Sequence, residues 1–202
     1  MAEKDQNLWD IITEESNRQL LQAAFDHAAR GLSFLIGHPL HSHEVGVRQA
    51  SIQELTELVG SPEDEFVGIY LLIKGNSLQQ AILMMPVVDG LRMAEQLLGE
   101  PDNSIQELGE LELSALAEVG NVVLTSCLNK LAQATGVATL PSPPAVVVDM
   151  LATLLSVTAA SAAVSGDNFY LLDSAFYDEY DTLKLRMWIL PDVDLQVALL
   201  KQ

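Results

Sequence analysis

One predicted helix carries polar side chains of unusual composition along a single side. Their spacing of three or four residues places them on one helix face: Glu110, Ser114, Glu118, Asn121, Thr125 and Asn129. Glu118 is the only charged residue between Leu113 and Asn129, whereas a solvated helix face usually mixes acidic and basic side chains. The face therefore favours close docking of another macromolecule, with a merely solvated face as the alternative.

Glu118 and Asn121 lie one helical turn apart, so their side chains can reach the same point in space. A carboxylate can pair with a lysine, and a carboxamide offers a water both a donor and an acceptor. Phosphoryl transfer requires a positioned water and organised charge rather than covalent chemistry by the protein. Because the sequence contains no glycine-rich phosphate loop, HExxH or GxSxG motif, the substrate would have to supply the remaining apparatus.

The helix that carries this face belongs to the second of two copies of one pattern. Long helices are predicted over about 8–36 and 108–135, and Gly136 is a plausible stop. The apolar stripe of the second helix consists of Leu113, Leu116, Val123, Cys127 and Leu131. A shift of 99 residues lays Leu20, Ala24, Ala28 and Leu32 onto Val119, Val123, Cys127 and Leu131.

The remaining elements recur in the same order. Each long helix precedes a turn-rich connection (37–43 and 136–144), a short strand (44–48 and 145–148) and a short helix (51–59 and 150–163). A hairpin follows, and its second strand ends at Pro86 or Pro191, with Asp89 or Asp194 three residues further on. We therefore predict an α/β (α+β) fold with a pseudo-two-fold repeat, in which long helices pack on a continuous antiparallel sheet. Residues 1–202 would form one domain of two repeats, about 8–100 and 105–202.

Four residues give a more specific resemblance. Ser114, Glu118, Asn121 and Pro143 are separated by three, two and twenty-one residues. This pattern resembles the active-site signature of the CheC, FliY and CheX family of bacterial chemotaxis phosphatases, and the segment 141–150 is similar to CheC in particular. The resemblance extends over about 14–200.

The resemblance implies hydrolysis of the aspartyl phosphate of a CheY-like response regulator. Glu118 would contact the regulator's active-site lysine, and Asn121 would orient the attacking water. Ser114 would shape the surface, and Pro143 would hold the following strand. No cofactor is expected in this chain, because Mg²⁺ would belong to the regulator. The alternative is a non-enzymatic adaptor that binds a response regulator, a CheD-type deamidase or a flagellar switch component.

The first copy departs from the signature. The shift of 99 residues places Glu15, Gln19 and Gln22 where Ser114, Glu118 and Asn121 stand. An amide thus replaces the anchoring carboxylate, and the second amide is longer by one methylene. We expect this degenerate first site to be inactive.

The net charge of the chain limits the kinds of partner that it can bind. Lys and Arg number 10 against 28 Asp and Glu, and the formal charge of −18 repels nucleic acid and anionic membrane surfaces. The first ten residues contain no basic stretch followed by an apolar run, so no secretory signal is predicted and the cytoplasm is expected. The apolar stretch 145–164 is interpreted as a buried strand and helix, because it contains Asp149 and lacks the basic flanks of a membrane span.

The remaining candidates have simpler interpretations. Cys127 lies among apolar helix residues and is interpreted as a core residue rather than a nucleophile. His38, His41 and His43 could together bind a transition metal, but a polar loop after the first long helix is the favoured reading. Trp9 and Trp188 are interpreted as packing residues.

Overall fold

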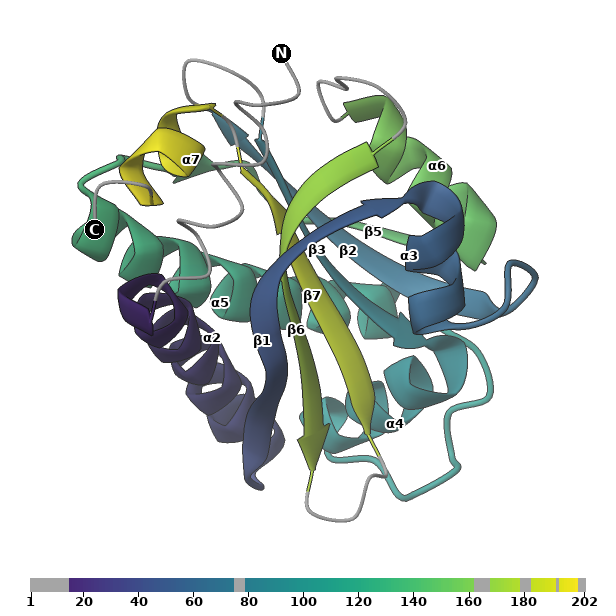
Figure 1. Cartoon of the computed structure of the whole chain (residues 1–202). Coiled ribbons are helices and arrows are strands. Elements are labelled where there is room, and N and C mark those ends of the chain that lie inside the picture. The colour runs from purple at the N-terminus through teal and green to yellow at the C-terminus, as the bar shows by residue number, and fades with distance from the viewer. Residues whose placement is uncertain (1–14, 75–78, 162–167, 179–182, 192, 200–202) are drawn as a thin grey trace.

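The computed structural model describes residues 15–74, 79–161, 168–178, 183–191 and 193–199 (Figure 1). The start predicted for the first long helix, at 8–14, lies outside these residues, as does Trp9. The first copy comprises α2 (Glu15–Ile36), β1 (Leu40–Ser51), α3 (Ile52–Val59), β2 (Glu65–Lys74), β3 (Gln79–Pro86) and α4 (Val87–Leu98). The second comprises α5 (Glu110–Thr135), β4 (Leu140–Pro141), β5 (Ala145–Met150), α6 (Leu151–Ser161), β6 (Asn168–Asp178), β7 (Lys184–Leu190) and α7 (Val193–Leu199).

The two long helices end at equivalent glycines. Gly37 follows α2 with φ of 81°, and Gly136 follows α5 with φ of 71°. Both occupy the left-handed region that glycine adopts without steric cost. Each amide donates to the carbonyl four residues earlier, that of Ser33 or Ala132. The 99-residue relation predicted from the sequence therefore holds at the ends of the helices.

The strands form one sheet in the order β1-β6-β7-β3-β2, and both β4 and β5 pair with β2. All pairs are antiparallel. The hairpins β2–β3 and β6–β7 meet at the centre, where β3 pairs with β7. Strands also pair across the two copies at the outer sides of these hairpins. Strand β1 of the first copy pairs with β6 of the second, and β5 of the second copy pairs with β2 of the first. The predicted pseudo-symmetric antiparallel sheet is confirmed.

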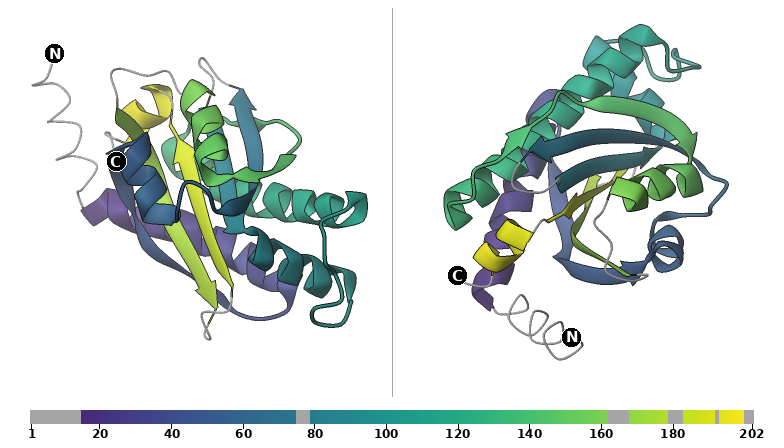
Figure 2. Two further views of the ribbon diagram at one scale, coloured as in Figure 1. Left: turned by 90° about the vertical axis from the view of Figure 1, so that its right-hand side faces the viewer. Right: turned by 90° about the horizontal axis from the view of Figure 1, so that it is seen from above.

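Helices cover both faces of this sheet (Figures 1 and 2). The long helices α2 and α5 pack together on one face, and the short helices α3 and α6 pack on the other. The larger core contains Ala24, Ala28 and Leu32 from α2 and Val123, Cys127 and Leu131 from α5, all buried as predicted. Leu113 is only partly buried.

Cys127 and Trp188 are packing residues, as predicted. Both are fully buried, and burial raises the pKa of the Cys127 thiol far above its usual range. A thiol that stays protonated and inaccessible is unsuited to nucleophilic attack. The indole nitrogen of Trp188 donates to Oδ1 of Asp173 at 2.8 Å, so the ring is held by a hydrogen bond as well as by packing.

The connection after α2 differs from the prediction. A turn-rich segment was expected as far as residue 43, with a strand only at 44–48, but β1 runs from Leu40 to Ser51. Antiparallel pairing with β6 extends the strand through residues 40–43, which the sequence assigned to the turn, and beyond residue 48. The register shifts between His43 and Gly46, and Glu44 there has φ of 54°. His41 and His43 therefore lie in a strand, and the polar-loop interpretation was wrong for them.

The stretch 145–164 forms β5 and α6 within its described part, but only the helix is buried as predicted. Of the strands that the structure describes, β5 pairs with β2 alone, and its side chains Val147, Val148 and Met150 are exposed, so the prediction of a buried strand was wrong. Leu151, Leu154 and Leu155 of α6 are buried against the sheet. Among the described helices, α5 alone has the length and apolar composition of a membrane span. One side of α5 packs on α2 and on the sheet, and its buried apolar residues belong to the larger core.

Candidate functional site

The predicted polar face lies on α5. Ser114 and Glu118 are exposed and Asn121 is partly exposed. Within the described part of the chain, the side chains of Glu118 and Asn121 make no hydrogen bond or ion pair. The hydroxyl of Thr125 donates to the backbone carbonyl of Asn121 and not to its side-chain carboxamide. A carboxylate and a carboxamide are thus presented one turn apart, with their hydrogen-bonding capacity available to a partner.

Gly120 holds this part of α5 against the sheet. It is buried, and a Cβ built on it would lie 2.2 Å from Cγ2 of Ile69 in β2. Glycine is therefore required for the close approach of helix and strand. The sequence alone does not indicate this role, because contact with Ile69 depends on tertiary packing.

We expect Gly120→Ala to destabilise the fold by about 1–3 kcal/mol, because the added methyl overpacks a filled site. Displacement of α5 would also move its neighbours Glu118 and Asn121. Chemical denaturation checks the stability, and the double variant Gly120→Ala with Ile69→Ala should be less destabilised than the sum of the single changes. Full additivity of the two changes would contradict a direct clash.

The first face differs from the second in more than residue type. Gln22 is exposed on α2, and its Nε2 donates to Oδ1 of Asp26 and to Oγ of Ser42, at 2.9 Å each. Ser42 donates in turn to the same carboxylate oxygen of Asp26. The donors of Gln22 are thus committed inside the molecule. Gln19 is also exposed on α2, and Glu15 is the first residue of that helix.

Pro143 lies on a different element from the other signature residues, in the exposed link between β4 and β5. Its neighbour Ser142 fixes this link to β2: its amide donates to the Leu72 carbonyl at 2.7 Å, and its hydroxyl oxygen accepts from the Leu72 amide at 3.1 Å. The 99-residue shift places Glu44 where Pro143 stands. The bulge in β1 therefore corresponds to the break between β4 and β5.

The histidines do not assemble a metal site. No group of three or more His, Cys, Asp or Glu side chains with metal-binding geometry occurs in the described ranges. The ring of His43 instead packs against Tyr177, with 5.3 Å between ring centroids. His38 and His41 border an open hollow beside α2.

Two solved structures have the same fold as this chain. FliY of Thermotoga maritima superposes with a TM-score of 0.68 and 18% identity, over 96% of this chain and 94% of FliY. CheX of Borrelia burgdorferi, solved in a CheX-CheY-BeF3-Mg²⁺ complex, superposes with a TM-score of 0.54 and 19% identity, over 84% of this chain and 96% of CheX. The chain thus has the fold shared by FliY and CheX.

The chain is also similar in sequence to a bacterial phosphatase. The CheY-P phosphatase CheC of Bacillus subtilis (strain 168) is 28% identical over 189 residues, which are 92% of this chain and 88% of CheC. No family model matches the sequence. The predicted resemblance to the CheC, FliY and CheX family of chemotaxis proteins is confirmed by the CheC sequence and the FliY and CheX folds.

Proposed function

We propose that this chain hydrolyses the aspartyl phosphate of a CheY-like response regulator. The supporting relatives are a CheY-P phosphatase that is similar along almost the whole chain and a CheX that forms a complex with CheY. The observation that carries the proposal is the pair of exposed Glu118 and partly exposed Asn121, which lie one turn apart and make no side-chain hydrogen bond or ion pair within the described structure. A regulator acting inside the cell would place this protein in the cytoplasm.

The proposed roles follow from the two side chains. Glu118 pairs with a lysine of the regulator and fixes the relative position of the proteins. Asn121 then accepts a hydrogen bond from a water and holds it in line with the bond between phosphorus and the aspartyl oxygen. Attack by this water forms a new P–O bond and releases the aspartate carboxylate and inorganic phosphate. Mg²⁺ in the regulator neutralises the phosphoryl oxygens, and this chain contributes no metal.

Glu118→Gln is expected to raise the KM for phosphorylated regulator by about tenfold or more, because a charge-assisted hydrogen bond is lost. The kcat at saturation should change less, since Asn121 still positions the water. Steady-state kinetics with phosphorylated regulator separate the two constants.

The matched control is Glu57→Gln, the same chemical change on α3, across the sheet from α5. This control should leave both constants within about twofold of wild type. An equal effect of the two substitutions on KM would refute a docking role for Glu118 and indicate general electrostatic attraction.

The alternative function is that of an adaptor which binds a regulator, a CheD-type protein or a flagellar switch component without turnover. The hydrogen bonds from Gln22 to Asp26 and Ser42 favour this alternative, because the Gln22 amide of the first face is already bonded within the molecule. Stable binding of phosphorylated regulator without acceleration of phosphate loss would identify an adaptor.

A further inference from the structure

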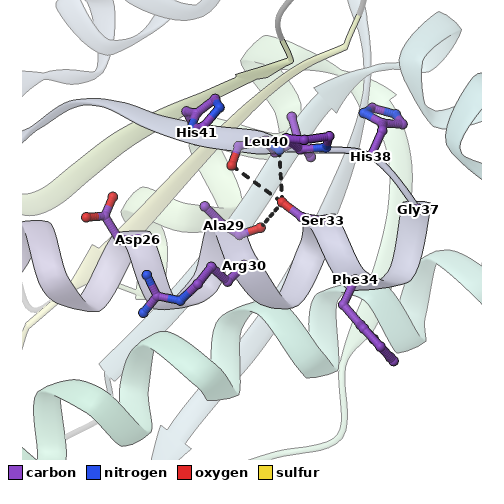
Figure 3. A pocket seen from close by; sticks show the side chains of 10 residues that line it. Asp26, Ala29, Arg30, Ser33, Phe34, Gly37, His38, Leu40 and His41 are labelled. Atoms are coloured by element: carbon purple, nitrogen blue, oxygen red, sulfur yellow. Dashed lines mark hydrogen bonds between the residues drawn. The ribbon is translucent and has the colours of Figure 1, made fainter.

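Phe34 is the most exposed large hydrophobic side chain among the described residues, with 88% of its surface accessible. It stands near the end of α2 and points away from β1, toward the side where α5 runs (Figure 3). A single exposed apolar residue is common and needs no explanation by itself. Its position relative to the candidate site makes Phe34 informative.

Contacts between α2 and α5 locate Phe34 along α5. A Cβ on Gly31 would lie 3.5 Å from Val122 and 3.5 Å from Ser126, so α2 and α5 are in close contact there. The helices run in roughly opposite directions (Figures 1 and 2). One turn beyond Gly31 on α2 therefore corresponds to one turn before Val122 on α5. This places Phe34 level with the part of α5 that carries Glu118 and Asn121.

The internal repeat provides a comparison within the same molecule. The 99-residue shift relates Gly31 to Lys130 and Phe34 to Gln133. The degenerate face on α2 is thus flanked by a lysine and a glutamine, whereas the intact face on α5 is flanked by a glycine and a phenylalanine. The exposed aromatic residue accompanies only the face that keeps the signature.

The charged groups beside Phe34 are balanced, whereas the chain as a whole is strongly negative. An open hollow of about 720 Å³ is lined by Phe34 together with Arg30, His38 and His41, and Asp26 is the acidic residue on its border. Arg30 lies one turn before Phe34 and is exposed. In a chain of net charge −18, the exposed guanidinium of Arg30 is a positive group that can pair with an acidic group on a partner surface.

We propose that Phe34 is the apolar anchor of the regulator-docking surface, supplied by the first repeat to the active face of the second, with Arg30 beside it meeting acidic groups of the regulator. This inference rests on the proposed function. Phenylalanine and arginine are both enriched at protein interfaces, where a few residues contribute most of the binding energy. The site thus spans both repeats, although only one helix carries the catalytic pair.

The test is Phe34→Ala, assayed for binding to a CheY-like regulator activated with beryllofluoride and Mg²⁺ and for turnover of the phosphorylated form. Affinity should fall at least about tenfold, and KM should rise in parallel, while kcat stays within about threefold. Phe34→Tyr should restore most of the affinity. Gln133→Ala, the equivalent change in the second repeat, should leave both assays unchanged.

Three results would overturn the proposal. The first is an affinity of Phe34→Ala within twofold of wild type, and the second is an equal loss in Gln133→Ala. The third is a wild-type dimer that Phe34→Ala dissociates without affecting regulator binding, which would assign Phe34 to a contact between copies. If the wild-type protein binds the regulator without hydrolysing its phosphate, and Phe34→Ala weakens that binding, the proposed hydrolysis is wrong but the role of Phe34 as an anchor is supported.

Discussion

Asn121→Ala is expected to lower kcat toward phosphorylated regulator by about 10²–10³-fold, with binding of the regulator retained. The expectation follows from loss of the group that holds the attacking water, an effect comparable to removing one preorganised transition-state donor. The carboxamide of Asn121 makes no internal hydrogen bond in the described structure, so its removal should cost little stability. Phosphate release under saturating regulator measures kcat, and a separate titration measures binding.

Gln22→Ala is the matched control, because Gln22 occupies the equivalent position in the first repeat. Its amide donates to Asp26 and Ser42 rather than facing solvent freely. Turnover by this variant should stay within about twofold of wild type. A loss of turnover in Gln22→Ala as large as that in Asn121→Ala would show that the first face is catalytic. Full activity of Asn121→Ala would show that Asn121 does not position the attacking water.

Asp173→Ala is expected to lower the free energy of unfolding by about 3–5 kcal/mol, the cost of breaking a buried ion pair by removing one partner. Asp173 is 1% exposed and accepts from Arg186 at 2.8 and 2.6 Å, from Arg48 at 2.9 Å and from Trp188 at 2.8 Å. Burial alone would lower the pKa of Arg186, but its hydrogen bonds and charge interactions with Asp173 and Glu44 raise it instead. Without Asp173, this guanidinium would keep only Glu44 as an acidic partner among the described residues.

Chemical denaturation of Asp173→Ala checks the expectation. The control is Asp102→Ala, in an exposed turn. It removes the same chemical group without leaving a buried charge unpaired, and should change the free energy of unfolding by less than about 0.5 kcal/mol. A loss below about 1 kcal/mol in Asp173→Ala would mean that water or rearrangement compensates Arg186. The network joins β1, β6 and β7 on the face of the sheet opposite α2 and α5, so this variant tests the scaffold rather than the candidate site.

The parts of the fold that were predictable are those that repeat. Helical periodicity located the buried stripe Val123, Cys127 and Leu131, and the 99-residue shift extended this prediction to Ala24, Ala28 and Leu32 of the first copy. Proline-terminated apolar runs located the last strand of each hairpin, which ends at Pro86 or immediately before Pro191. These signals are local, so a single sequence contains them.

The missed features all depend on partners distant in the chain. The length of β1 follows from pairing with β6, and Gln22 is committed by Ser42, twenty residues away. The requirement for glycine at 120 comes from Ile69. One sequence signal could have revealed Phe34, since it falls outside the apolar stripe of its helix and aligns with the polar Gln133 of the other copy.

The decay of a phosphorylated CheY-like regulator should be followed with and without a substoichiometric amount of this protein, at constant Mg²⁺. Hydrolysis by the α5 face predicts that one molecule of the protein accelerates phosphate loss from many regulator molecules, in proportion to its concentration, and that Asn121→Ala at the same concentration does not. A decay rate unchanged by the wild-type protein, under conditions where the two proteins bind, would contradict a phosphatase function.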